Sequence, residues 1–110
     1  MTEPEPDLLS RLWKEHLRTP FPPHIRGREF THDGMLFDMV LLDADIAGCV
    51  SSTLSGPLDE QRQRTLLVCL AAVEAVLPSI DDEDGAIEYY ERLRHMAALA
   101  VKAGSISKAP

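Results

Sequence analysis

Apolar residues recur at helical spacing in four segments of the 110-residue chain, and turn or breaker residues separate these segments. The segments are approximately residues 7–19, 35–54, 58–77 and 81–104. Asp7 and Asp33 are potential N-caps of the first two, and Ser79 or Asp81 is a potential N-cap of the fourth. No run alternates clearly enough to predict a strand. The pattern therefore predicts a single all-α domain over residues 1–110, with flexible tails at 1–6 and 105–110.

The connection between the first two predicted helices is the longest irregular segment of the sequence. Residues 19–34 read TPFPPHIRGREFTHDG and contain three prolines and two glycines. We expect Phe21, Ile25 and Phe30 to hold this loop against the helices. The other two connections are short, so consecutive helices should be antiparallel neighbours. The expected architecture is a four-helix bundle with a long proline-rich loop between helices 1 and 2.

One aspartate interrupts the apolar stripe of the second predicted helix. Steps of four and three residues give the line Leu36, Val40, Asp43, Ala47, Val50 and Leu54. If this line faces the core, the Asp43 carboxylate is partly buried. It must then be paired, hydrogen-bonded or protonated, because an unpaired buried charge is costly. Asp38 and Asp45 fall on the opposite face, where solvated acids are expected.

Partners for Asp43 can be sought on the other predicted elements. His16 shares an apolar face of the first helix, Tyr89 lies on the buried line of the fourth, and Arg26 and Arg28 belong to the loop. Two interpretations follow. In one, an Asp43–His16 or Asp43–Arg pair belongs to a ligand-binding or catalytic pocket under the loop, lined also by Tyr89. In the other, a hydrogen-bonded ion pair only anchors the loop.

The net charge of −7 argues against nucleic acid and anionic membranes as partners, because both attract basic surfaces. No apolar run reaches the length of a membrane span, and the acidic start MTEPEPDLL differs from a signal peptide. Cys49 and Cys69 form no CxxC motif and suggest reduced thiols in the cytoplasm. Cys69 falls on the apolar line of its helix and should be buried, whereas Cys49 lies off the line and should be exposed.

Metal and cofactor motifs are missing from the sequence. The four histidines form no HxxxH or HExxH motif, and no phosphate-binding glycine loop occurs. A loop cluster of His24, His32, Asp33 and Asp38 is the nearest approach to a metal site. The acidic run DDEDG at 81–85 lacks the ligand spacing of a calcium loop and fits a helix start instead. We therefore expect no metal site and no cofactor.

These observations favour a protein that acts by protein–protein interaction, as a regulatory, inhibitory or accessory factor without catalysis of its own. The partner is another protein or a second copy, which would give a homodimer. Candidate interface residues are Tyr90, at the edge of its buried line, and Leu41 and Leu42, on the face opposite the core stripe. Leu67 is a further apolar position that widens the apolar stripe of the third predicted helix. The alternative function is the pocket around Asp43, His16 and the Arg26/Arg28 loop.

Overall fold

A computed structural model of the chain describes residues 5–81, 83 and 85–107. These residues form four α-helices, α1 (Glu5–Arg18), α2 (Met39–Ser55), α3 (Glu60–Val76) and α4 (Ala86–Ser107). They also form a hairpin of β1 (Glu29–His32) and β2 (Met35–Asp38), and two 3-10 turns, η1 (Pro23–Ile25) and η2 (Leu77–Ser79). The prediction of a mostly helical chain is confirmed. The predicted tails lie partly outside the described residues, but residues 5–6 and 105–107 are helical.

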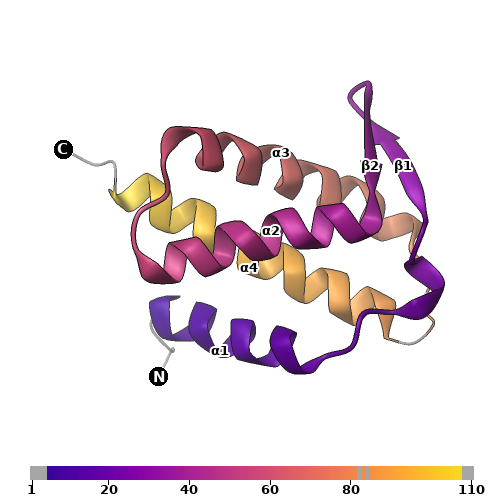
Figure 1. Ribbon diagram of the computed structural model, residues 1–110, viewed down its shortest axis with the longest axis horizontal. Coiled ribbons are helices and arrows are strands. Elements are labelled where there is room, and N and C mark those ends of the chain that lie inside the picture. Colours follow the sequence, from indigo (N-terminus) through magenta and orange to yellow (C-terminus); the bar gives the residue numbers. More distant parts are fainter. Residues whose placement is uncertain (1–4, 82, 84, 108–110) are drawn as a thin grey trace.

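The helices pack side by side, and the hairpin stands out from them (Figure 1). α1 and α3 lie on opposite sides of α2 and α4, so that the two central helices contribute to both interfaces. The hairpin rises next to the end of α3 that leads into η2. Within the described ranges, no helix is long and apolar enough to cross a bilayer.

The predicted irregular loop between the first two helices contains the 3-10 turn η1 and the first strand of a β-hairpin. Glu29 to His32 pair antiparallel with Met35 to Asp38, so the prediction of no strand is wrong. Asp33 and Gly34 form the two-residue turn, with φ angles of 52° and 76°. An Asp-Gly turn with two positive φ angles suits the twist of a hairpin, and this dipeptide was the sequence signal. The rings of Phe30 and Phe37 stack across the strands at 5.3 Å between centroids.

The second helix was predicted to begin at residue 35. Because residues 35–38 form strand β2, it begins at Met39. Asp38, and not Asp33, is the N-cap, because its carboxylate accepts a hydrogen bond of 3.0 Å from the Leu41 backbone NH. The buried side chains of α2 are Met39, Leu42, Ile46, Cys49 and Val50. This stripe is rotated from the predicted line, since Leu36 lies exposed in β2 and Leu54 is exposed. Asp43 therefore flanks the buried stripe and does not lie at its centre.

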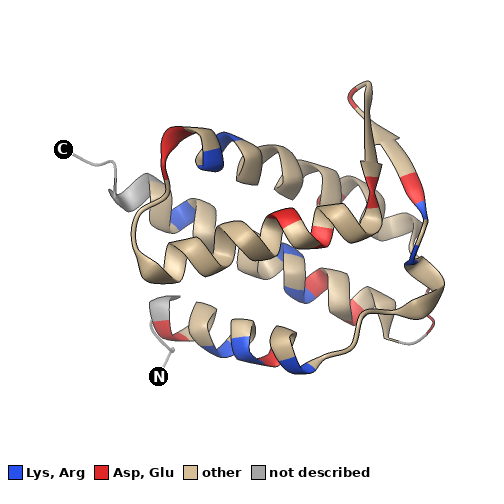
Figure 2. Ribbon diagram, viewed as in Figure 1, with Lys and Arg blue, Asp and Glu red and all other residues tan. Residues whose placement is uncertain are grey.

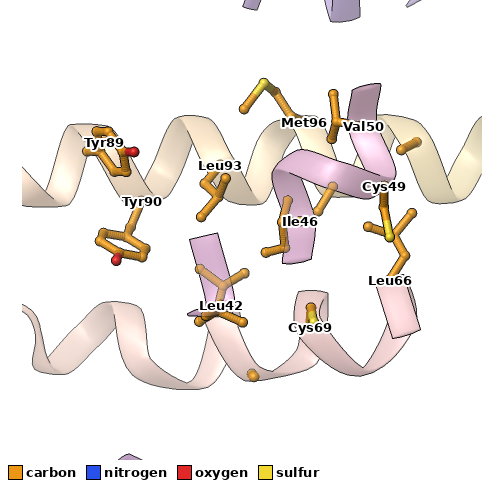
Figure 3. Packing of buried hydrophobic residues seen from close by; sticks show 14 of the residues in the cluster. Leu42, Ile46, Cys49, Val50, Leu66, Cys69, Tyr89, Tyr90, Leu93 and Met96 are labelled. Carbon is orange, nitrogen blue, oxygen red and sulfur yellow. The ribbon is translucent and has the colours of Figure 1, made fainter. Parts of the chain in front are cut away.

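The core is filled mainly from α2, α3 and α4 (Figure 3). On α4 the buried line is Ala86, Tyr89, Tyr90, Leu93, Met96, Ala97 and Ala100. Figure 3 shows Leu93 after the two tyrosines along α4, with Leu42 of α2 on the side of α4 that faces α3. Cys69 is buried as predicted, but the expectation of an exposed Cys49 is wrong. The rotation of the α2 stripe turns Cys49 toward α3, where its thiol lies 3.7 Å from the Arg62 carbonyl oxygen.

The third and fourth helices begin slightly later than predicted. Asp59 caps α3 by accepting a hydrogen bond of 2.8 Å from the Arg62 backbone NH. α4 begins at Ala86, after Gly85 with a φ of 71°. The described acids of the DDEDG run, Asp81 and Glu83, thus precede the helix, while Asp82 and Asp84 lie outside the described residues.

Candidate functional site

Three polar side chains from three helices meet beside the core. The Asp43 carboxylate lies 2.9 Å from Nε2 of His16 through Oδ1. Its other oxygen, Oδ2, accepts a hydrogen bond of 2.6 Å from the Tyr89 hydroxyl. The Tyr89 hydroxyl also lies 3.3 Å from His16 Nε2. We call His16, Asp43 and Tyr89 the Asp43 cluster.

Helix geometry brings the Asp43 cluster together. His16 lies in the last turn of α1, Asp43 in the second turn of α2, and Tyr89 in the first turn of α4. In the segment after α1, the Phe21 ring lies edge-on to Tyr89, at 5.6 Å between centroids. Trp13, one turn before His16, stacks on the imidazole at 6.1 Å. Aromatic rings therefore enclose the cluster and limit its contact with water.

Burial sets the electrostatics of the Asp43 cluster. The His16 and Asp43 side chains are 6% and 15% exposed. Burial raises the pKa of Tyr89 above the usual range of a phenol, and the hydrogen bond to Asp43 raises it further. Tyr89 is therefore a neutral donor at physiological pH. Both oxygens of the Asp43 carboxylate have a polar partner, Tyr89 at Oδ2 and His16 at Oδ1, which compensates for its partial burial.

One member of the cluster and one neighbouring side chain have buried polar atoms without a hydrogen-bond partner in the described part of the chain. His16 Nδ1 is buried and has no hydrogen-bond partner among the described residues, and the same is true of Nε and Nη2 of Arg92. The Arg92 guanidinium lies over the Tyr89 ring, 5.9 Å from its centroid. Arg92 was not among the residues predicted for this site. Its position three residues after Tyr89 on the same helix was the available signal.

The two loop arginines do not join the Asp43 cluster. Arg26 lies over the Phe21 ring at 5.2 Å, a cation–π contact outside the cluster. Arg28 lies 3.8 Å from the Asp81 carboxylate, and both side chains are more than half exposed. The structure thus brings together His16, Asp43 and Tyr89, and places Arg26 and Arg28 elsewhere. The partners of the two arginines are therefore Phe21 and Asp81, and neither belongs to the cluster.

A second candidate site is a groove between α2, α3 and the hairpin. It consists of three clefts with volumes of about 460, 340 and 270 Å³. The first and second share Asp45, Gln61 and Thr65, and the second and third share Met35, Phe37 and Val68. The clefts therefore run into one another, and we call them together the α2–α3 groove. None of the three is lined by a member of the Asp43 cluster.

The α2–α3 groove changes character along its length. At the end near the start of α3 it is lined by Ala44, Asp45, Gly48, Ser52, Asp59 and Thr65. At the hairpin end it is lined by Met35, Phe37, Leu67, Val68 and Ala71, together with His32 and Asp33. Sequence analysis singled out Leu67 but not the groove, because the hairpin that forms one wall was not predicted.

The three predicted interface residues have different locations. Leu41 is exposed. Tyr90 and Leu42 are not on the surface, which corrects their predicted placement: both are buried in the core, and the Tyr90 hydroxyl donates a hydrogen bond of 2.9 Å to the Met39 carbonyl oxygen. Leu42 is buried because it belongs to the buried stripe of α2, which is rotated from the predicted line. Tyr90 is buried under the first turn of α2, which contains Met39.

The described residues of these sites include no cluster of metal ligands. In the part of the chain that the structure describes, no three His, Cys, Asp or Glu side chains group as metal ligands. The chain matches no protein-family model, and the searches of curated proteins and solved structures gave no match.

Proposed function

We propose that this chain acts by binding another protein, as a regulatory, inhibitory or accessory factor, through the α2–α3 groove. The observation that carries this proposal is the exposure of apolar side chains at the hairpin end. Met35 and Leu67 are each 52% exposed, and Val68 is 42% exposed. They lie together in one cleft. Contiguous exposed apolar surface of this kind is typical of interaction sites.

In this proposal the helices form a four-helix bundle that serves as a rigid support in the cytoplasm. Two free cysteines, Cys49 and Cys69, suit a reducing compartment. The hairpin supplies the second wall of the site. Because it projects from the helices (Figure 1), it gives a partner access to both α3 and β2.

Photo-crosslinking followed by binding measurements tests the proposal. A photoreactive residue at Leu67 should crosslink a partner in cells, whereas the same residue at Leu17, which is 65% exposed on α1, should not. With the purified partner, Val68→Glu should weaken binding at least 100-fold, because a central apolar contact is replaced by a charge. The matched control Leu17→Glu should change the Kd less than threefold. Equal effects of the two substitutions would refute the groove as the interface.

A second candidate function is a small-ligand site at the Asp43 cluster. The observation in its favour is the buried and unpaired Nδ1 of His16 beside two further polar side chains. NMR fragment screening tests it by following the His16 ring signals. Fragments that shift these signals, and lose the effect in Asp43→Asn, support a pocket. An unperturbed His16 ring favours a purely structural role.

A further inference from the structure

Gly48 is a glycine that the packing of this chain does not require. It lies in the interior of α2, is exposed, and lines the α2–α3 groove. A Cβ atom added to it would meet nothing within 4 Å. Its φ is not in the left-handed region, so the backbone does not require glycine either. Since glycine weakens a helix interior, a close approach by another molecule would explain its presence.

We propose that the α2–α3 groove receives an α-helix of a partner protein, which packs over Gly48, pairs a Lys or Arg with Asp45, and places apolar side chains against Val68. This inference rests on the proposed function and specifies its partner. Three features of the groove support it: its shape, its backbone and its charge.

The shape of the groove fits a short helix. Ala44 and Gly48 are one turn apart on α2, and both side chains are small enough for a second helix to approach closely. Along α3 the lining extends from Gln61 to Ala71, which is about 15 Å at 1.5 Å per residue. This length accommodates roughly three turns of a partner helix.

The backbone around the groove favours a helix over an extended peptide. Two of its walls are helices, whose backbone NH and CO groups are largely hydrogen-bonded internally. An extended peptide would find few backbone partners along α2 and α3, whereas a helix satisfies its own backbone. The hairpin offers an edge of only four residues.

The charge of the groove calls for a cationic partner. Arg62 is paired with Asp59 at 2.9 Å, and Arg64 lies 3.8 Å from Glu60. Asp45 lines two of the three clefts, and its side chain makes no hydrogen bond or ion pair with any described residue. Figure 2 shows acidic positions on α2, at the start of α3 and on the hairpin.

The same charges disfavour a second copy of the chain in the groove. Each copy carries a net charge of −7. A twofold interface built on this surface would bring both copies of Asp45 into one contact. Like charges at an interface weaken association, so a basic helix from a different protein fits better.

Peptide display on the full chain tests the proposal. A library of random 16-residue peptides is selected on the immobilised protein and counter-selected against the Gly48→Gln variant. We expect enriched peptides with apolar residues at positions i, i+3 or i+4, and i+7, together with Lys or Arg. Synthetic copies should gain helical circular dichroism on binding. Failure to enrich peptides, or enrichment of acidic or proline-rich ones, would overturn the inference.

Substitutions in the groove give the quantitative arm of the test. Gly48→Gln should weaken peptide binding at least 20-fold by filling the space over α2, and Gly48→Ala should weaken it less. Both variants should fold, since a Cβ at this position meets no described atom and glycine is the poorer helix former. Asp45→Lys should weaken binding at least tenfold and redirect a repeated selection toward acidic peptides. Its matched control is Glu91→Lys, an exposed site on α4 with the same change in net charge, which should alter the Kd less than twofold.

The outcomes separate this inference from the proposed function. One outcome is that a partner crosslinks at Leu67 and loses its binding in Val68→Glu but not in Gly48→Gln. In that case the proposed interaction role stands, and the inference of a partner helix over Gly48 is wrong. If no partner crosslinks at Leu67, the proposed function itself fails. If light scattering shows a dimer that Gly48→Gln dissociates, the occupant is a second copy and the inference is overturned.

Discussion

Replacing Tyr89 with phenylalanine removes one oxygen atom from the Asp43 cluster and leaves the aromatic packing in place. The lost interaction is the 2.6 Å hydrogen bond from the Tyr89 hydroxyl to Oδ2 of Asp43. Hydrogen bonds to charged groups contribute about 1.5–3 kcal/mol to stability. We therefore expect Tyr89→Phe to lower the free energy of unfolding by about 2 kcal/mol.

The neighbouring tyrosine provides a matched control. Tyr90→Phe removes a hydroxyl that donates to the neutral carbonyl oxygen of Met39 at 2.9 Å. A neutral hydrogen bond contributes about 0.5–1.5 kcal/mol, so this substitution should cost about 1 kcal/mol less than Tyr89→Phe. Both tyrosines are buried, and both substitutions delete the same atom, so the comparison isolates the charge of the acceptor.

Urea unfolding followed by far-ultraviolet circular dichroism measures both variants. With a denaturant slope of roughly 1–3 kcal/mol per molar, Tyr89→Phe should lower the midpoint by about 1 M without changing the slope. In an Asp43→Ala background, Tyr89→Phe should cost about 1 kcal/mol or less, because the charged acceptor is absent and only the 3.3 Å contact with His16 Nε2 remains. The reasoning is refuted if Tyr89→Phe costs no more than Tyr90→Phe, or if its full cost persists without Asp43.

Three further predictions concern the hairpin, the groove and the buried thiol. Gly34→Ala should destabilise the hairpin by about 1 kcal/mol, because Gly34 has a φ of 76°, at which alanine is strained. Native-state hydrogen exchange of β1 and β2 measures this effect, and unchanged protection would contradict it. Gly48→Ala should raise the free energy of unfolding by about 0.5–1 kcal/mol in urea titrations, and a loss would show that the fold needs this glycine. Burial raises the pKa of the Cys69 thiol from its ordinary value of 9.0 to about 11, so the unfolded chain ionises first as the pH rises. Stability should therefore fall between pH 9 and 11, less steeply in Cys69→Ala, and a constant urea midpoint over this range would contradict the prediction.

The hydrophobic pattern determined the number and approximate extent of the helices. Helical periodicity depends on residues three and four apart, so it is readable without knowing the partners of each helix. The boundary errors have local causes. The segment from Met35 to Val40, which is apolar except for Asp38, fits a strand or a helix, and the Asp33–Gly34 turn favours a strand for its first four residues. The buried stripe of α2, which is rotated from the predicted line, includes Leu42 and Cys49, and packing against the other helices decides this rotation.

Only the tertiary structure decided which groups meet. Asp43 has its partners 27 and 46 residues away along the chain, and the sequence could nominate His16, Tyr89, Arg26 and Arg28 but could not choose among them. The choice depends on how three helices are placed side by side, which local spacing does not encode. The α2–α3 groove is likewise formed by the hairpin and two helices together. The sequence by itself determined local helical segments and acidic charge, whereas packing between distant elements determined both candidate sites, because contacts between helices depend on their relative rotation in the fold.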